Sequence, residues 1–469
     1  MSNGPYMGIT VAHHPVRILP DILRAGRDTP SGLESRQRER LRRLVAFARE
    51  HSAYYGKLYS GLPSAIRDPR ILPPVSKRDL MANFDGWATD DAVRRETADA
   101  FVADPARVGR FYLDRYLAFA TSGTTGRPAV FLHDRGAVNV YIALMLVRCL
   151  PMLFASASVA SFLKNGGRTA TIITTGGHFT SSVIEALVRS RFPRLSGRNR
   201  TFSLLDPLPD VVRALNGFQP AVIGSYPTAL AVLAGEQAAG RLRIQPALAL
   251  SGAERLSRAA AERIRASFLC PFHDTYAASE FMGIAFDCRY GNLHLNADWV
   301  ILEPVDAALR PVPPGIPSHS TLLTNLANRV QPIIRYDLGD SVTMLPARCP
   351  CGSTLPTIRP EGRRDEILYL ESPDGGMKPI LPLVLATVVE ETAGILSYQV
   401  IRAGARRLRV RLDEAPGYER TRVGEDLLRR LREYLSSMNL ESVVVELSGE
   451  KPVRNPSGGK LRQFYAEER

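Results

Sequence analysis

The sequence predicts an α/β protein with a large N-terminal part and a smaller α+β part at the C-terminus. Three observations lead to this class. Between about residues 115 and 320, short β-rich apolar runs alternate with helical ones, which is typical of parallel strands with crossover helices. From about 298 to 370 the runs are shorter and punctuated by Pro and Gly, which favours antiparallel strands. The last hundred residues combine a hairpin, a helix and a strand.

Each predicted element has its own local pattern. Residues 34–61 should form an amphipathic helix, because Leu41, Leu44 and Phe47 recur at helical spacing. Strands are expected at 169–174, 220–225 and 246–252, separated by helices at 181–192 and 227–242. In the C-terminal part, a hairpin at 398–414 precedes a helix at 420–438 and a strand at 443–447. We place the boundary near Asp365, which gives two domains, 1–364 and 365–469.

The composition is that of a globular protein with more than one core. The chain has 469 residues, of which 45% are hydrophobic and 23% charged, so a disordered or fibrous protein is excluded. Its net charge is +13, and of its 60 basic residues only six are lysines. The arginine excess has two interpretations, a general bias of the surface or attraction of polyanions such as nucleotides, coenzyme A or an acidic carrier protein. No aromatic-rich basic block points to nucleic acid.

Cysteine usage and apolar patterning favour a cytoplasmic location without a membrane anchor. Five scattered cysteines do not suggest a disulfide scaffold. The first 26 residues lack the apolar stretch of a signal peptide. The most apolar region, 137–163, is interrupted by Arg148 and Pro151 and is too short between them to span a bilayer.

The densest local motif, TSGTTGRP, runs from Thr121 to Pro128 directly after an apolar run. Small hydroxyl and glycine residues in a turn expose backbone N–H groups and hydroxyls, the donors that a phosphate requires. The alternative is a flexible Gly/Thr turn without a ligand. It is not a Walker A loop, because no Gly-Lys-Ser/Thr follows. The candidate phosphate-binding residues are Ser122, Gly123, Thr124, Thr125 and Gly126.

Five further segments follow in chain order: SGAE at 251–254, YAASE at 276–280, RYDLGD at 335–340, GRRD at 362–365 and PSGGKLR at 456–462. With the phosphate loop, they resemble the ordered motifs of the adenylate-forming (acyl/aryl-CoA synthetase) superfamily. Two N-terminal stretches, LRRLVAFAREHSAYYGKLY and LPPVSKRDLMANF, are similar to its phenylacetate–coenzyme A ligase-like branch.

The resemblance implies a fold and a set of roles. The N-terminal domain would hold two α/β sheet layers and a small β region, and the C-terminal α+β domain would be a mobile lid with its hinge at Asp365. Lys460 would be the adenylation lysine, and Glu280 would help to hold Mg²⁺. The implied ATP-binding residues are Gly252, Ala253, Glu254, Tyr276, Ala277, Ser279, Asp340 and Arg363, besides those of the phosphate loop.

The residue chemistry agrees with those roles. When a carboxylate attacks the α-phosphate of ATP, negative charge grows on the phosphoryl oxygens and must be met by donors, a metal and a cation. Three departures from the family pattern stand out. The phosphate loop ends in Arg-Pro-Ala rather than Arg-Pro-Lys, so one phosphate cation is missing or supplied elsewhere. Ser279 replaces the usual Thr, and Asp337 stands where a basic residue is common.

Cysteines and a histidine form a second constellation. Cys288 and His294 lie just after the YAASE segment, and Cys349 and Cys351 follow about 55 residues later. Three thiolates and one imidazole make a complete tetrahedral zinc set, and a closed set is structural rather than catalytic. The alternative is four reduced side chains without a metal, since Cys-x-Cys is tighter than the usual spacing.

The acyl substrate has weaker candidates. His178 and Phe179 follow one predicted strand and Tyr226 follows another, and ligands of α/β sheets usually bind at such strand ends. A surface histidine is the alternative for His178. Branch analogy favours an aromatic acid.

The resemblance implies an ATP-dependent ligase that forms an acyl-AMP and transfers the acyl group to coenzyme A. Two alternatives stay open for the acceptor, an amine or a carrier-protein thiol. A non-catalytic nucleotide-binding protein is a third alternative, suggested by the missing loop lysine. We expect ATP, Mg²⁺, coenzyme A and structural Zn²⁺ as cofactors, no nucleic acid or membrane partner, and leave a homodimer open.

Overall fold

A computed structural model of the chain describes residues 15–64, 66, 68–121, 129–149, 151, 156–173, 175, 177–191, 197–254, 256, 258–380, 382–454 and 461–467. The phosphate-loop candidates Ser122 to Gly126 and the predicted adenylation lysine, Lys460, lie outside these described residues.

The N-terminal region is helical. Its elements are α1 (Pro15–Ala25), α2 (Pro30–His51), α3 (Ala53–Leu58), η1 (Pro69–Ile71), α4 (Lys77–Ala82), α5 (Phe84–Trp87), α6 (Arg95–Ala103) and η2 (Pro105–Arg107). The single helix predicted over 34–61 is wrong in one respect, because it is divided at Ser52. Ser52 has extended backbone, and its hydroxyl accepts a hydrogen bond from the Tyr55 N–H at 3.3 Å. It therefore ends α2 and caps α3.

A nine-stranded mixed sheet forms the centre of the molecule, with the strand order β14-β15-β10-β9-β8-β7-β6-β4-β5. Neighbours from β5 to β8 pair in parallel, whereas every pair from β8 to β14 is antiparallel. Its strands are β4 (Thr169–Ile173), β5 (Asn199–Ser203), β6 (Val222–Ser225), β7 (Leu248–Gly252), β8 (Phe272–Ala278), β9 (Phe281–Asp287), β10 (Leu293–Leu295), β14 (Asp340–Met344) and β15 (Thr357–Arg363).

Crossover helices connect the parallel strands, as the alternating pattern predicts. They are α9 (Thr180–Arg191), α11 (Leu208–Phe218), α12 (Pro227–Ala238) and α13 (Arg258–Phe268), and a further helix, α8 (Ser156–Lys164), precedes β4. The change from parallel to antiparallel pairing falls at the turn between β8 and β9. That turn carries Ser279 and Glu280, so the predicted metal-binding carboxylate lies where the sheet changes direction.

Two three-stranded sheets accompany the large one. The first contains β1 (Phe111–Tyr112), β2 (Tyr116–Ala120) and β3 (Val130–Asp134), followed by α7 (Arg135–Leu144) and a π-helical turn, η3 (Met145–Cys149). The second contains β11 (Val300–Val305), β12 (Ser320–Asn325) and β13 (Tyr336–Asp337), all antiparallel as predicted. One apolar cluster joins these sheets to the N-terminal helices.

The C-terminal elements have an apolar cluster of their own, from Leu368 to Phe464. They are η5 (Arg364–Glu366), β16 (Leu368–Glu371), β17 (Met377–Ile380), α14 (Pro382–Glu390), β18 (Ile395–Gly404), β19 (Arg407–Glu414), α15 (Arg420–Ser437), β20 (Val444–Leu447) and β21 (Phe464–Ala466). The predicted hairpin, helix and strand are all present. Helix α15 buries Val423, Leu427, Leu431 and Leu435, spaced four residues apart, against the four-stranded sheet β20-β19-β18-β21.

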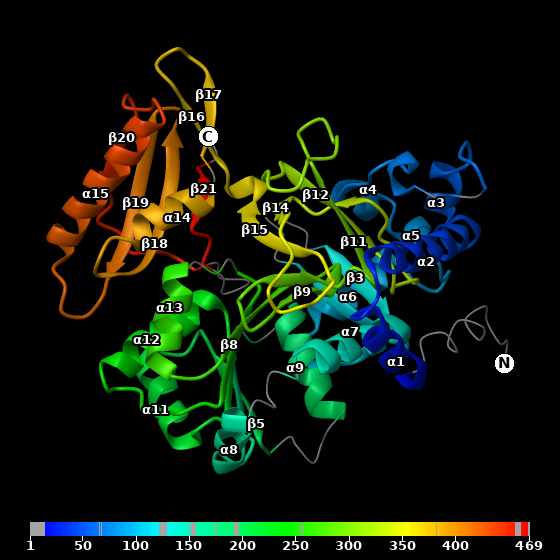
Figure 1. The fold of residues 1–469 in the computed structure, drawn as a ribbon, viewed down its shortest axis with the longest axis horizontal. Helices are drawn as coiled ribbons and strands as arrows, with labels where there is room; N and C mark the ends of the chain where they lie inside the picture. Colours follow the sequence, from blue (N-terminus) through cyan, green and yellow to red (C-terminus); the bar gives the residue numbers. More distant parts are fainter. Residues whose placement is uncertain are drawn as a thin grey trace.

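Figure 1 shows this C-terminal part, orange to red, beside α12, α13 and β15, with the blue N-terminal helices at the opposite end of the molecule. Contacts join α12 to β18, α13 to α14 and α14 to β15. The mixed α/β class is confirmed, with a large mixed sheet and a small C-terminal sheet. Among the described residues, no helix has the length and apolar character needed to cross a membrane.

Candidate active site

The turn between β8 and β9 brings together residues from three of the predicted motifs. Tyr276 is half-buried near the end of β8, and its hydroxyl donates a hydrogen bond to Asp340 Oδ2 at 2.6 Å. Ala277 lies beside it, where a register shift between Tyr276 and Ala278 interrupts the β8–β9 ladder. The residue predicted to stack on adenine therefore touches the residue predicted to bind ribose.

Asp340 and Arg363 face each other across the β14–β15 ladder, in direct register. The Arg363 guanidinium donates to Asp340 Oδ1 at 3.0 Å and to Asp365 Oδ1 at 3.1 Å. Although burial opposes it, these carboxylates raise the pKa of Arg363, so the cation is permanent. The predicted ribose site and the predicted hinge thus share one arginine.

The Glu280 carboxyl group is buried, and burial raises its pKa above the ordinary value, while a hydrogen bond from the Tyr336 hydroxyl opposes that shift. The Asn325 side-chain amide donates to the Glu280 carbonyl at 2.8 Å. A carboxylate held in this way, with little water around it, fits the role of a Mg²⁺ ligand.

A buried polar network supports this turn, and the sequence analysis did not foresee it. His133 Nε2 is 2.8 Å from the Ser279 carbonyl, and its Nδ1 is 2.9 Å from the Tyr141 hydroxyl, which also accepts a hydrogen bond from Asn325. The ring donates from Nε2 because a carbonyl can only accept. Burial lowers the pKa of His133 to about 4, so it is neutral at pH 7. The Ser279 hydroxyl pairs with Thr180 Oγ1 at 3.0 Å.

The predicted adenine-contacting turn follows β7. Gly252 allows close strand approach, because a Cβ there would lie 2.4 Å from Thr275 Oγ1. Ala253 has a left-handed backbone, with φ +68°. The Glu254 carboxylate accepts from Thr228 Oγ1 at 2.6 Å and from the Leu461 N–H at 3.2 Å. Glu254 therefore connects the large sheet to the C-terminal part.

The segment that carries Lys460 is held at both ends. The buried Gln399 side chain donates to the carbonyls of Val453 and Arg462, at 3.0 and 2.9 Å, and accepts from the Val453 N–H at 2.9 Å. The Arg462 guanidinium donates to the Asp365 carbonyl at 2.9 Å. The residues that follow Lys460 in the chain thus contact both the adenine turn and the hinge motif.

Asp337, unusual at its position in the motif, has a local explanation. Its carboxylate accepts a hydrogen bond from Arg364 at 2.8 Å and another from the Ser320 hydroxyl. Burial opposes ionisation, but these donors lower its pKa below the ordinary value. The aspartate and Arg364 of the hinge motif therefore form an ion pair beside the site.

The three acyl-pocket candidates come from neighbouring elements. His178 is buried, with its ring 5.4 Å from that of Phe101, and burial lowers its pKa. Phe179 is half-buried and covers Gly177. Tyr226 is buried at the start of α12, with its hydroxyl 3.4 Å from Ser181 Oγ. His178 is thus not a surface histidine, while the substrate roles of all three stay predictions.

The second constellation comes together as one cluster. The ligand atoms of Cys288, His294, Cys349 and Cys351 all lie within 4.8 Å of one another. The Cys288 and Cys349 sulfurs are 3.6 Å apart, and Cys351 Sγ is 3.2 Å from His294 Nε2. Sulfurs bound to one tetrahedral zinc lie about 3.8 Å apart, since the Zn–S bond is about 2.3 Å. The cluster therefore has the dimensions of a four-ligand metal site.

Surrounding groups orient these ligands. His294 Nδ1 lies 3.2 Å from the Leu355 carbonyl, which leaves Nε2 free to bind a metal. The Asn292 amide donates to Cys349 Sγ at 3.3 Å. Burial opposes ionisation of Cys349, but hydrogen bonds from the Cys351 backbone and from Asn292 lower the pKa of its thiol to about 6. Gly352, with φ +86°, allows the chain to turn after Cys351.

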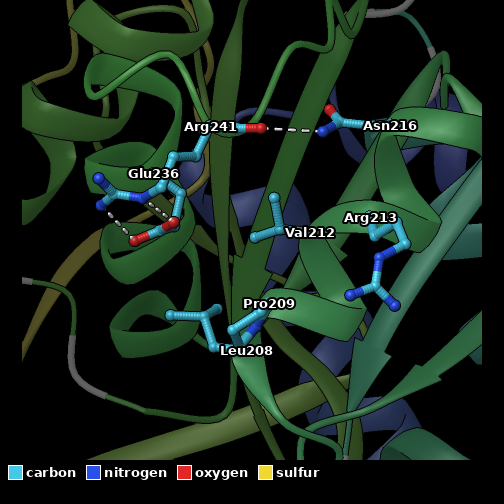
Figure 2. A pocket seen from close by; sticks show the side chains of 7 residues that line it. All are labelled: Leu208, Pro209, Val212, Arg213, Asn216, Glu236 and Arg241. Carbon is cyan, nitrogen blue, oxygen red and sulfur yellow. Dashed lines mark hydrogen bonds and ion pairs between the residues drawn. The ribbon is translucent and has the colours of Figure 1, made fainter.

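A surface hollow of about 430 Å³ lies away from both constellations, between α11 and α12 (Figure 2). Its polar groups pair with one another, because Arg241 and Glu236 lie 2.7 Å apart and the Asn216 amide donates to the Arg241 carbonyl at 2.8 Å. None of the predicted site residues lines it, and we assign it no ligand.

The chain is similar to two known proteins over about two thirds or more of its length. It is 27% identical to phenylacetate-coenzyme A ligase of Thermus thermophilus over 354 residues, 72% of each chain. It is 20% identical to protein CapK of Staphylococcus aureus, over 66% of this chain and 62% of that one. No family model matches the chain.

Solved structures share the fold. A 2-hydroxyisobutyryl-CoA ligase in the postadenylation state, bound to its acyl-AMP, superposes with a TM-score of 0.63 at 18% identity, over 93% of this chain and 89% of that one. An anthranilate CoA ligase with anthranoyl-AMP gives 0.53 at 14% identity, over 74% and 65%.

The class of protein that the chain resembles follows from these comparisons. It shares the fold of solved acyl-AMP-bound CoA ligases and is similar in sequence to a phenylacetate-coenzyme A ligase, in agreement with the adenylate-forming superfamily that its ordered motifs resemble. Within that class, its similarity to phenylacetate-coenzyme A ligase agrees with the branch that the N-terminal stretches resemble.

Proposed function

We propose that the protein is an AMP-forming acid–coenzyme A ligase. The observation that carries the proposal is the convergence of Tyr276, Glu280, Asp340 and Arg363, which lie at or next to the ends of strands β8, β14 and β15. The chain that follows Lys460 is fixed to the end of the neighbouring strand β7 through Glu254. These groups are the ones that carboxylate activation by ATP requires.

In the first half-reaction, a carboxylate oxygen attacks the α-phosphorus of ATP, and the bond to the bridging oxygen breaks to release pyrophosphate. Tyr276 supports the adenine ring, Asp340 accepts hydrogen bonds from the ribose hydroxyls, and Lys460 and the phosphate loop meet the charge on the phosphoryl oxygens. Glu280 would hold Mg²⁺, which supplies further charge neutralisation when bound.

In the second half-reaction, the thiol of coenzyme A attacks the acyl-adenylate carbonyl and AMP leaves. We propose that residues 365–469 act as a mobile lid, because Lys460 serves only the first step and would obstruct the thiol in the second. The contact of the Leu461 backbone with Glu254 supports the first-step arrangement. The exposed Arg462–Asp365 pair ties the same segment to the predicted hinge residue in this arrangement.

We further propose that the acid is aromatic and that the cysteine cluster binds structural Zn²⁺. The aromatic class is supported by the likeness to phenylacetate-coenzyme A ligase. The zinc is supported by four soft ligands at tetrahedral spacing that leave no open position for a substrate.

The test is acid-dependent ATP–pyrophosphate exchange across a panel of aryl and fatty acids, followed by product analysis with coenzyme A, an amine and a carrier-protein thiol. Exchange with aryl acids and a coenzyme A thioester as product are expected. An amide or a carrier-bound thioester as the product would mean that the acceptor is an amine or a carrier-protein thiol, while the adenylation step would stand. ATP binding without exchange for any acid would contradict the proposed function.

A further inference from the structure

Lys77 is the first residue of α4, and the structure brings it to the phosphate loop from 44 positions upstream. Its ammonium donates a hydrogen bond to Thr121 Oγ1 at 3.0 Å. Thr121 is the last described residue before Ser122, and its N–H bonds to the Ala129 carbonyl at 2.9 Å. Residues 122–128 come between these two hydrogen-bonded positions in the chain, so Lys77 contacts the residue that directly precedes the predicted phosphate-binding segment.

The segment that carries Lys77 is fixed against the nucleotide site. Val75 bridges to Tyr336 in parallel, with its N–H on the Arg335 carbonyl at 3.1 Å and its carbonyl on the Asp337 N–H at 2.9 Å. Ser76 then caps α4 through a reciprocal pair of hydrogen bonds with Asp79. Because Tyr336 also contacts Glu280, the position of Lys77 is set from the same strand that holds the predicted Mg²⁺ ligand.

Lys77 lies among charged residues of the proposed nucleotide site and has donors left for an anionic ligand. The half-buried ammonium feels the negative Glu280 and Asp365 and the positive Arg363, although burial is the largest influence and lowers its pKa. Within the described part of the chain, its hydrogen-bond partner is a neutral hydroxyl and no carboxylate lies within ion-pair distance. An ammonium has three donors, so two are left for a ligand.

The sequence supplies the reason for a cation at this place. The predicted phosphate loop is followed by Arg-Pro-Ala, ending at Ala129, where many members of the superfamily it resembles have Arg-Pro-Lys, so one phosphate cation is missing or supplied from elsewhere in the chain. We infer that Lys77 binds the β/γ-phosphate end of ATP in place of the missing loop lysine. The inference rests on the proposed function for its biological meaning, but it concerns nucleotide binding alone.

The role separates ATP from AMP. A contact to the pyrophosphate part is absent from AMP and from the acyl-adenylate. Lys77 should therefore serve ATP binding and adenylation and take no part in transfer to coenzyme A. A structural role would instead change the affinity for both nucleotides.

The experiment measures binding of AMP and of α,β-methylene-ATP by calorimetry, with Mg²⁺ and without acid, on the full chain. Lys77→Ala should weaken the ATP analogue about ten- to a hundredfold, the usual worth of one charged hydrogen bond, and leave AMP affinity within about twofold. Lys77→Arg should restore most of the ATP affinity. Lys57→Ala, at an exposed lysine of α3, is the matched control and should change neither.

Equal losses for AMP and the ATP analogue, or no loss for either, would overturn the inference. If Lys77→Ala unfolds at a lower temperature than the wild type, the affinity of Lys77→Arg for the ATP analogue decides instead. Arginine can still donate a hydrogen bond to Thr121, so a loss of ATP affinity in this variant would overturn the inference. If the wild type binds ATP but exchanges pyrophosphate with no acid, the proposed function fails while the nucleotide measurements still decide on Lys77.

Discussion

The cysteine cluster and the proposed nucleotide site differ in how many separate parts of the chain supply their residues. The cluster draws all four ligands from the turn after β9, from β10 and from the loop between β14 and β15, and their ligand atoms lie within 4.8 Å of one another. The nucleotide site is distributed over α4, β8, β14 and β15, and it is completed by the C-terminal segment beside Glu254. Four ligands that lie close together in one part of the fold suit a permanently bound metal. A site whose residues come from two parts of the molecule suits a reaction in which one part leaves between the two steps.

The two regions also differ in which ligand their polar side chains are free to bind. In the cluster, the His294 ring pairs with the Leu355 carbonyl, and the Cys349 and Cys351 sulfurs accept hydrogen bonds from Asn292 and from the Ser353 N–H. The ligand atoms that remain available to a metal lie close to one another. In the nucleotide site, Lys77 and Glu280 are held in place while retaining capacity for a ligand that comes and goes. Four predictions test this contrast, from the largest expected effect to the smallest.

Lys460→Ala should reduce adenylation by about a thousandfold, because the cation proposed to meet the charge on the reacting phosphoryl group is lost. Transfer of a preformed acyl-adenylate to coenzyme A should stay largely intact. Both half-reactions are measured separately, with Lys451→Ala, an exposed lysine paired with Asp413, as the control. Equal loss of the two half-reactions would contradict the proposal that Lys460 serves adenylation alone.

Cys349→Ser, or removal of the metal by a chelator, should destabilise the protein by on the order of 3 kcal/mol, since the binding free energy of a structural metal contributes to folding. The affinity for ATP should change by less than about twofold. Thermal unfolding and metal analysis measure the first effect, and calorimetry the second. A protein that holds no zinc as purified and unfolds at the same temperature would show the cluster to be four reduced side chains.

The two regions should respond to pH in opposite directions. Asp274 is half-buried on β8, where its carboxylate accepts a hydrogen bond from the Ser251 hydroxyl, and desolvation raises the pKa of its carboxyl group from 3.8 to about 7. Because the folded pKa is higher than the unfolded one, the neutral form favours folding, and that stability is lost as the pH rises through 7. Metal binding to thiols, by contrast, strengthens with pH because protons must leave.

Between pH 5.5 and 7, wild-type stability should therefore fall by about 2 kcal/mol more than that of Asp274→Asn, at about 1.4 kcal/mol per pH unit. Denaturant unfolding at several pH values measures the difference. Parallel curves for the two proteins would mean that Asp274 is ionised when folded.

Arg462→Ala should have the smallest effect, a two- to fivefold loss of adenylation, because an exposed ion pair with Asp365 is worth about 1 kcal/mol or less. Transfer to coenzyme A should be unchanged or slightly faster, since the variant loosens only the first-step arrangement. A slower transfer step would show that Arg462 serves both arrangements.

Much of the fold follows from local patterns. The strands at β4, β6 and β7 and the helices α9, α12 and α15 have apolar spacing that neighbouring residues alone determine. The Ser52 break is a local signal too, since a serine before an aromatic helical turn is a typical N-cap, yet the apolar spacing continues across it and conceals it.

The site depends on contacts that local patterns do not contain. The motif residues Tyr276, Glu280 and Asp340 were identified by resemblance, whereas Lys77 and the Asn325–Tyr141–His133 network became visible only in three dimensions. Asn325 and Tyr141 are 184 positions apart, and a buried amide cannot be distinguished from an exposed one in sequence. Lys77 had one usable signal, the scarcity of lysine together with a loop that lacks one.

The Gln399 side chain acts as a staple for the end of the chain. From one position on β18 it holds Val453 and Arg462, nine positions apart, through three hydrogen bonds. An apolar residue of similar size, as in Gln399→Leu, would remove all three at once, because a leucine side chain neither donates nor accepts a hydrogen bond. One amide therefore couples two distant positions of the chain, and a change there would reach both the Val453 backbone and the residues beside the predicted hinge.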